Sequence, residues 1–210
     1  MIKHIFFDFN GTIINDVKLC LDLLNEILRK QGKRELTLEE YREVFKFPIK
    51  QYYIDAGVDF NIESFESLAV KFIEKYQPQS FSCGLYPNTR QTVEYLRNKG
   101  IHTYILSASE VNNLKEQCQV YGICDLFDEI LGIDNIHASS KVDIAIDFMK
   151  KSNIEPSEAL FIGDTLHDVE VAKAIGANSL LVCEGHQARS VLAKANVKIL
   201  STISDLRDIF

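Results

Sequence analysis

Short apolar runs alternate with amphipathic segments from about residue 85 towards the end of the chain. Four of these runs are rich in branched and aromatic residues and are typical of buried strands: 101–106, 127–131, 159–163 and 179–183. Four other segments repeat their apolar positions at helical spacing: 89–100, 111–122, 141–152 and 168–177. Strands that alternate with helices predict βαβ units, and therefore a parallel sheet with helices on both faces.

The N-terminal part of the chain has a different pattern. Residues 5–9, with the sequence IFFDF, predict a first buried strand that joins the sheet, whereas residues 17–82 predict helices and no strand. The expected fold is therefore α/β, a doubly wound and mostly parallel sheet with a small all-helical cap domain inserted after the first strand. We expect the core domain to comprise 1–16 and 83–210, and the cap domain to comprise 17–82.

Helix boundaries within the predicted cap follow from capping residues and breakers. Asp16 is placed to cap a helix that runs to about Arg29. Thr37 and Glu40 have the spacing of a capping box at the start of a second helix. A further amphipathic helix is expected to stop before Pro78, because proline has no backbone N–H and disfavours a helical conformation in the residue before it.

Composition narrows the function classes. The chain has 210 residues, 25% of them charged and 46% hydrophobic, which is ordinary for a soluble globular protein. The net charge of −7 argues against binding to a phosphate backbone, so no nucleic-acid partner is expected. No apolar stretch approaches membrane-spanning length, and the five cysteines form no CxxC pair. We expect a cytoplasmic protein with reduced thiols and no membrane partner, and the oligomeric state is not readable from the sequence.

Polar side chains follow three of the predicted strands directly. Asp8 follows the apolar residues IFF of the first strand, Ser107 follows the strand at 101–106, and Asp164 follows the strand at 159–163. Parallel strands end at the same edge of a sheet, and ligands bind outside the carboxyl ends of such strands. Asp8, Asp164 and the nearby Asp168 would bring three carboxylates together, which requires a compensating cation. An all-oxygen ligand set suits Mg²⁺.

These residues lie in four motifs that resemble those of the haloacid dehalogenase-like (HAD) hydrolases, of the phosphoglycolate-phosphatase-like kind with a helical cap. The segment DFNGT at 8–12 is similar to the nucleophile motif, and Ser107 to the Ser/Thr of the second motif. Lys141 in SSKVD is similar to the lone lysine of the third motif, and GDTLHD at 163–168 to the acidic fourth motif. The resemblance covers nearly the whole chain and implies a Rossmann-like core.

The resemblance implies a phosphatase mechanism with Asp8 as nucleophile. Asp8 would attack phosphorus and form an aspartyl-phosphate that water then hydrolyses. Mg²⁺ would be held by Asp8, the backbone carbonyl of Asn10 and Asp164, with Asp168 bound directly or through a water.

Phosphate binding is assigned by the same resemblance. Ser107, the backbone N–H of Ala108 and the turn at Asn10 and Gly11 would hold phosphoryl oxygens, and Thr12 of the same motif is included in this group. Lys141 would neutralise charge on the nucleophile and the phosphate. Gly11 would allow the backbone to approach the ligand closely.

Asn10 departs from the family pattern, which has an acid at this position. That acid protonates the leaving oxygen and later activates water, and such proton transfer typically contributes ~10²–10⁴-fold to the rate. An amide cannot titrate. The chain would then be a slower phosphatase or one suited to leaving groups that need little protonation, such as aryl, acyl or phosphoanhydride groups. His167 and His186 are alternative proton donors, although an ordinary surface or loop role is favoured for each.

Two other classes of function remain open from the sequence. A chain that binds phosphate and Mg²⁺ with little turnover would be a ligand-binding or regulatory protein, although the intact Asp8, Ser107, Lys141 and Asp164 speak against it. Another chemistry on the same fold is the second class. A mutase depends on the missing acid, and a dehalogenase would leave Asp164 without a purpose. A phosphonatase would need a cap lysine that forms a Schiff base.

A cap over the site favours a small phosphorylated metabolite as the partner. Arg42, Lys46 and Lys50 lie near aromatic residues in the predicted cap, and they are candidates to meet an anionic substrate tail such as that of phosphoglycolate. Lys46 and Lys50 are also the candidates for a Schiff base. The alternative is a charged, solvated helix face with Phe45 and Phe47 in the cap core, and it is at least as well supported.

Overall fold

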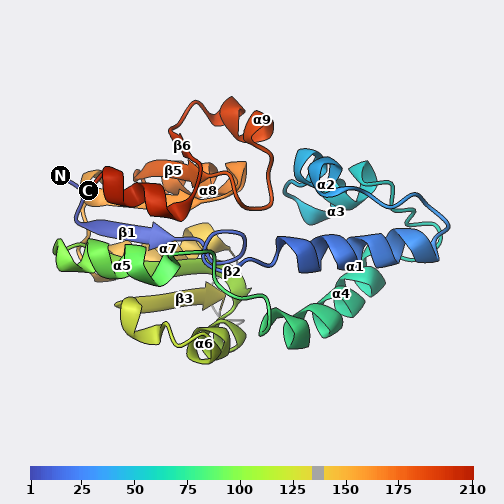
Figure 1. Cartoon of the computed structure of the whole chain (residues 1–210), viewed down its shortest axis with the longest axis horizontal. Coiled ribbons are helices and arrows are strands. Elements are labelled where there is room, and N and C mark those ends of the chain that lie inside the picture. Colours follow the sequence, from blue (N-terminus) through green and yellow to red (C-terminus); the bar gives the residue numbers. More distant parts are fainter. Residues whose placement is uncertain (134–139) are drawn as a thin grey trace.

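The computed structural model describes residues 1–133 and 140–210, and its centre is a six-stranded parallel sheet. The strands lie in the order β3-β2-β1-β4-β5-β6 (Figure 1). Their bounds are β1 His4–Phe7, β2 His102–Glu110, β3 Glu129–Ile133, β4 Ala159–Gly163, β5 Asn178–Val182 and β6 Ile199–Leu200. The order reverses at β1, which pairs with β2 on one side and β4 on the other. In open α/β sheets, this switch point is where ligands bind.

Helices cover both faces of the sheet. Alternate residues of a strand point to opposite faces, so Ile5 and Phe7 pack into one hydrophobic cluster and Phe6 into another. The first cluster includes side chains of α5 (Thr89–Asn98) and α6 (Val111–Val120), and the second includes those of α7 (Lys141–Lys151) and α8 (Leu166–Ala174). The remaining short helices are η1 Cys124–Leu126, η2 Pro156–Glu158, α9 Arg189–Leu192, η3 Ala193–Ala195 and η4 Ile203–Asp208. The predicted α/β fold with a parallel sheet is confirmed.

Residues 17–82, named here the cap segment, form four helices that lie beyond the carboxyl ends of the strands (Figure 1). These helices are α1 Val17–Lys30, α2 Leu38–Val44, α3 Ile49–Asp55 and α4 Phe65–Ser80. The helices bury a hydrophobic cluster of their own, which contains Leu24, Tyr41 and Tyr52. The division into two domains at 17 and 82 stays a prediction.

Two details of the cap segment test the helix boundaries predicted from sequence. Thr37 and Glu40 form the expected capping box at the start of α2. Pro78, in contrast, lies inside α4 instead of after it. Near the end of a helix, proline removes a single backbone hydrogen bond, and tertiary contacts offset this loss. The side chain of Gln117 donates a hydrogen bond of 2.7 Å to the Ser80 hydroxyl and so ties the end of α4 to α6.

None of the helices formed by residues 1–133 and 140–210 combines the length and the apolar character that a membrane crossing requires.

Candidate active site

Three carboxylates meet at the carboxyl edge of the sheet, next to the switch point. Asp8 directly follows β1, Asp164 directly follows β4, and Asp168 lies in the first turn of α8. Phe7 pairs with Ile162 in the sheet, and this register places the two strand ends side by side. One oxygen of each carboxylate lies within 4.8 Å of the others. The structure therefore brings together the three acids that the sequence predicted to converge.

Lys141, the first residue of α7, lies between two of these acids. Its Nζ atom donates hydrogen bonds to Asp8 at 2.5 Å and to Asp168 at 2.8 Å. The side chains of Lys141 and Asp168 are 4% and 3% exposed, whereas that of Asp8 is 13% exposed. Burial opposes the charge of Lys141, but the two carboxylates outweigh it and raise its pKa. Lys141 is thus a buried cation beside the most accessible of the three acids.

Asp164 is held by the first motif and by the loop after β5. Its carboxylate accepts a hydrogen bond of 3.1 Å from the Thr12 hydroxyl and one of 2.6 Å from the backbone N–H of His186. A Cβ atom on Gly11, whose φ is +72°, would lie 2.4 Å from an Asp164 oxygen, so only glycine fits this turn. The structure places Thr12 behind Asp164, and Thr12 does not line the cavity described below.

Asp168 is anchored within its own turn. One of its oxygens accepts hydrogen bonds from the backbone N–H and the hydroxyl of Thr165 at 2.9 and 2.7 Å, and from the backbone N–H of Asp164 at 3.2 Å. Its other oxygen accepts from Lys141. With both oxygens engaged, Asp168 orients Lys141 and the strand end, which agrees with an indirect role at a metal site.

The charge balance of this cluster favours a bound cation. Burial raises the pKa of Asp8, which Lys141 opposes and Asp168 reinforces. Burial also raises the pKa of Asp164, which His186 opposes, while Asp8 and Asp168 reinforce the rise. Three acids face one lysine, and a divalent cation would relieve the remaining repulsion. The donor set is entirely oxygen, so the residues fit Mg²⁺.

Asp16 belongs to the site and was missed in the sequence, where it was expected only to cap α1. It occupies the N-cap position but makes no side-chain capping bond. Instead its buried carboxylate accepts hydrogen bonds of 2.9 Å from the side-chain amide of Asn10 and 2.9 Å from the backbone N–H of Gly11. The available signal for this role in the sequence was that an acid, Asp16, lies six residues after Asn10 in the same loop. The side chains of the two residues meet because the loop folds back on itself.

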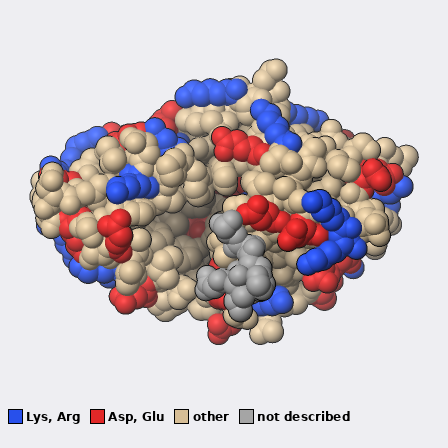
Figure 2. Space-filling model, turned by 180° about the vertical axis from the view of Figure 1, so that it is seen from behind, with Lys and Arg blue, Asp and Glu red and all other residues tan. Residues whose placement is uncertain are grey.

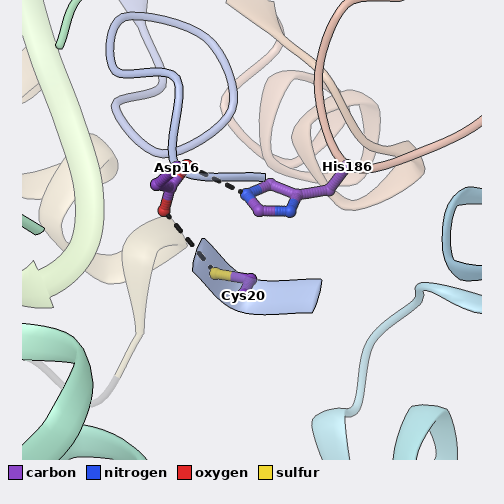
Figure 3. Close-up of side chains that lie close together, drawn as sticks. All are labelled: Asp16, Cys20 and His186. Carbon is purple, nitrogen blue, oxygen red and sulfur yellow. Dashed lines mark hydrogen bonds and ion pairs between the residues drawn. The ribbon is translucent and has the colours of Figure 1, made fainter. Parts of the chain in front are cut away.

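Figure 3 shows that Asp16 also lies between two further side chains, the His186 ring and the Cys20 thiol. His186 Nε2 is 3.2 Å from Asp16, and His186 Nδ1 is 2.7 Å from the Tyr41 hydroxyl. Burial opposes the charge of His186, but Asp16 outweighs it and raises the His186 pKa to about 9. Atoms of Asp16, Cys20 and His186 also lie within 4.8 Å of one another. The internal pairing of Asp16 with His186 makes this group a poorer fit for Mg²⁺ than the all-oxygen cluster.

Tyr76 joins the cap segment to the first motif. Its hydroxyl donates a hydrogen bond of 2.6 Å to Asp16 and accepts one of 2.5 Å from the Asn10 amide. The side-chain oxygen Oδ1 of Asn10 accepts a hydrogen bond of 3.1 Å from the Ser109 hydroxyl. Both ends of the Asn10 side chain are therefore engaged, and Tyr76 of α4 contacts it from the cap side.

The second motif lies on the other side of Asp8. Ser107 is buried in β2, and its hydroxyl accepts a hydrogen bond of 3.1 Å from the backbone N–H of Ser109. Ser107 and Ala108 line the same cavity as Asp8 and Lys141. The third motif begins at residue 139, which lies outside the described residues, whereas its lysine is described.

The three carboxylates, Lys141 and Ser107 line a cavity of about 380 Å³ between the sheet edge and the cap segment. Figure 2 shows a hollow between the two parts of the molecule with an acidic side chain visible inside it. The core wall of the cavity carries Asp8, Lys141 and Asp164, whereas its cap wall carries Phe45 and Phe72. His167 and His186, the candidate proton donors, both line the cavity.

The three cap cations proposed from the sequence lie elsewhere. The Lys50 ammonium lies over the Phe60 and Phe65 rings, 5.8 and 5.7 Å from their centroids. Lys46 pairs with Asp55. None of Arg42, Lys46 and Lys50 is among the described residues that line the cavity. The structure therefore does not bring Lys50 to the substrate, because its stem and charge are used within the cap segment.

Arg42 has a structural partner in the core. Its guanidinium donates a hydrogen bond of 2.9 Å to the backbone carbonyl of Gly185 and another to that of Glu184. The side chain of Gln187 donates a bond of 2.8 Å to the carbonyl of Phe45. Together these contacts dock α2 onto the loop after β5.

Comparisons with known proteins agree with this geometry. The family model of haloacid dehalogenase-like hydrolases matches residues 5–182. A phosphoglycolate phosphatase from Vibrio vulnificus is 24% identical over 218 residues, which cover 99% of this chain and 96% of that protein. A phosphoglycolate phosphatase from Pseudomonas fluorescens is 25% identical and covers 98% of this chain and 77% of the relative.

A solved structure has the same fold over the full length. A haloacid dehalogenase-like hydrolase from Streptococcus pneumoniae superposes with a TM-score of 0.82 at 19% sequence identity, covering 100% of this chain and 98% of that one. The family match spans far more than half of the chain, and it includes the segments that carry Asp8, Ser107, Lys141 and Asp164. This chain is a hydrolase that belongs to the haloacid dehalogenase-like hydrolase family.

Proposed function

We propose that the protein is a Mg²⁺-dependent phosphatase that hydrolyses a small phosphate monoester through an aspartyl-phosphate on Asp8. Membership of the hydrolase family and the phosphoglycolate phosphatases among the relatives support the phosphatase activity. The alternative of a binding protein with little turnover has no support among these relatives. The partner is a small phosphorylated molecule, and neither nucleic acid nor membrane is part of the proposal.

One observation carries the proposal: the chain of contacts Asp8–Lys141–Asp168 at the sheet edge. A nucleophilic carboxylate must remain ionised and must approach an anionic phosphoryl group. Lys141 supports both requirements, since it contacts Asp8 directly and is itself buried. Asp168 keeps Lys141 in this position from the opposite side.

The chemistry then has two steps on one carboxylate. An oxygen of Asp8 forms a bond to phosphorus while the bond from phosphorus to the ester oxygen breaks, and the leaving oxygen keeps the electron pair. Water next attacks the phosphorus, the bond to Asp8 breaks, and inorganic phosphate is released. Ser107 and the backbone N–H of Ala108, which line the cavity beside Asp8, would hold phosphoryl oxygens during both steps.

The metal would be held by Asp8, Asp164 and the backbone carbonyl of Asn10, with Asp168 supporting the site from its turn. When bound, Mg²⁺ supplies positive charge that lowers the repulsion between the Asp8 carboxylate and the phosphoryl oxygens. Thr12 and the backbone N–H of His186 keep Asp164 in place for this role.

A panel of phosphate esters tests the proposal. Wild-type protein should release phosphate in the presence of Mg²⁺ and lose the activity when the metal is chelated. Asp8→Asn should abolish turnover, since removal of a nucleophile can cost up to ~10⁶-fold. Asp125→Asn provides a control at an exposed carboxylate outside the cavity, where activity should stay within a few-fold of wild type. Phosphatase activity that survives in Asp8→Asn would contradict the mechanism.

A further inference from the structure

The apolar cap wall continues from the active-site cavity into a second cavity inside the cap segment. This second cavity has a volume of about 280 Å³ and lies among α1, α2, α3 and α4. The two cavities share five lining residues: Cys20, Phe45, Ile49, Phe72 and Ile73. An ester whose phosphorus lies at Asp8 would direct its leaving group away from the sheet edge, towards this apolar space.

The charges around the active-site cavity disfavour a leaving group that carries a carboxylate. Among the described lining residues, Lys141 is the single lysine or arginine, and it is already paired with Asp8 and Asp168. Glu110 lines the cavity as well, and hydrogen bonds from the backbone N–H groups of Asn112 and Asn113 hold the pKa of its carboxyl below the usual range. Among the described lining residues, a second anion on the substrate would therefore meet an acidic rim and two cations, Lys141 and His186, that are already paired with carboxylates.

Asn10 independently restricts the leaving group. Its amide is held by Asp16, Tyr76 and Ser109 and has no proton to transfer to a departing oxygen. An aliphatic alcohol depends on such a proton, because its hydroxyl is about as weak an acid as water and its anion leaves poorly. A phenol has a pKa of about 10 and leaves readily as the anion.

We propose that the substrate is an aryl phosphate, the phosphate monoester of a phenolic hydroxyl, whose ring packs against Phe45, Phe72 and Ile73. The proposal deepens the function proposed above and rests on it. The bond from an Asp8 oxygen to phosphorus forms as the bond from phosphorus to the phenolic oxygen breaks. The phenolate departs with the electron pair and takes a proton from water, and a second water releases phosphate from Asp8.

Three probes separate the two properties of the leaving group, its apolar character and its ability to leave without a proton. Phenyl phosphate is apolar and leaves readily, benzyl phosphate is equally apolar but is an alkyl ester, and phosphoglycolate is an anionic alkyl ester. Burial of the ring should lower KM for phenyl and benzyl phosphate about 10–100-fold relative to phosphoglycolate. The single-turnover rate of ester cleavage should be about 10²-fold higher for phenyl than for benzyl phosphate, because only the alkyl ester needs an acid.

A pair of variants on α4 tests where the ring binds. Ile73 is 48% exposed and lines both cavities, whereas Val70 is 59% exposed and lines neither. Ile73→Arg should raise KM for phenyl phosphate about tenfold or more and lower KM for phosphoglycolate, since it puts a cation on the cap wall. Val70→Arg places the same charge one turn away and should change neither value more than about twofold.

The outcomes distinguish this inference from the proposed function. Wild-type preference for phenyl phosphate, reduced by Ile73→Arg and unaffected by Val70→Arg, supports the aryl substrate. A kcat/KM for phosphoglycolate equal to or above that for phenyl phosphate overturns it and leaves the phosphatase intact. An aryl preference that Ile73→Arg does not change also overturns it, because the ring then binds elsewhere. Absence of Mg²⁺-dependent hydrolysis for all three esters removes the proposed function and the inference together.

Discussion

The two walls of the active-site cavity differ in what holds them together. On the core wall, Lys141 and Asp168 are nearly fully buried charges whose side chains make two and four hydrogen bonds, and they are fixed at helix ends. The cap wall presents Phe45, Phe72 and Ile73, and several charged side chains of the cap segment pair with one another away from the cavity.

This difference assigns separate tasks to the walls. A buried charge without a partner is costly, so the core wall has one geometry that satisfies all of its members, as a catalytic site requires. Apolar contacts are non-directional and tolerate leaving groups of different shape. We therefore expect the chemistry to take place at the sheet edge and the cap segment to select the substrate. The following predictions test this separation, from the largest expected effect to the smallest.

Removal of the buried cation should have the largest effect. In Lys141→Met, Asp8 and Asp168 lose the charge between them, so the pKa of Asp8 rises further and its nucleophilic form is depleted. We expect kcat to fall about 10³-fold for every ester, with circular dichroism used to verify folding. The exposed Lys115 on α6 provides the control, and Lys115→Met should retain full activity. A loss below about tenfold would show that the core wall does not depend on Lys141.

Restoring an acid at position 10 should change the core wall while leaving the cap wall intact. In Asn10→Asp, the new carboxyl faces Asp16, whose carboxylate now lies 2.9 Å from the Asn10 amide. Repulsion between the two acids should raise the pKa of one of them and keep it protonated at neutral pH, which suits a proton donor. We expect the single-turnover cleavage of benzyl phosphate to rise about 10²-fold.

The same variant carries its own internal control. Phenyl phosphate needs little protonation, so its cleavage rate should change less than tenfold, and KM for both aromatic esters should stay near the wild-type value. An unchanged rate for benzyl phosphate would mean that the missing acid does not limit the reaction.

The contact that Tyr76 makes between the two walls should have a smaller effect, and this effect should be on the stability of the fold. Tyr76→Phe removes the hydroxyl that donates to Asp16 and accepts from Asn10. A hydrogen bond to a charged group contributes about 1.5–3 kcal/mol, so the free energy of unfolding in urea should fall by about that amount. Tyr95→Phe on α5 is the matched control, and equal effects of the two substitutions would refute a special role for the Tyr76 contact.

Surface charges of the cap segment should have the smallest effect, a change in the free energy of unfolding that depends on pH. Glu26 on α1 pairs with Lys30 and with Lys75 of α4, and these side chains lower its pKa to about 2. A lowered folded-state pKa stabilises the protein above the unfolded value of about 4.3, and the stabilisation is lost as pH falls towards 2. Glu26→Gln should cost less than about 1 kcal/mol at pH 7, and its difference from wild type should shrink by pH 3.

Asp22→Asn, which removes a pairing with Lys18 inside α1, is the control for that experiment. Its effect on unfolding should be no larger than that of Glu26→Gln, because it does not connect two helices. If Glu26→Gln instead costs several kcal/mol, charges stabilise the cap segment as strongly as they do the core wall.

The core half of the site was largely predictable because its residues follow predicted strands. Asp8, Ser107 and Asp164 each come directly after an apolar run, and parallel strands must end at a common edge. The same rule does not reach Asp16 or Tyr76, whose positions depend on how a loop folds back and how α4 leans on the first motif. Local propensity also misplaced the end of α4, since contacts to α6 extend it past Pro78.

The amino-acid sequence by itself determined the parallel sheet, the family motifs and the carboxylates at the sheet edge. The reason is that apolar periodicity and residue spacing are local patterns that can be read along the chain. Only the tertiary structure decided what the cap presents to the substrate. Lys46 and Lys50 look like ligands for an anion in the sequence, yet one pairs with Asp55 and the other covers aromatic rings. The direction of a long charged side chain depends on the partners that folding brings close to it. Here the cap lysines turn away from the cavity, and an apolar wall faces Asp8.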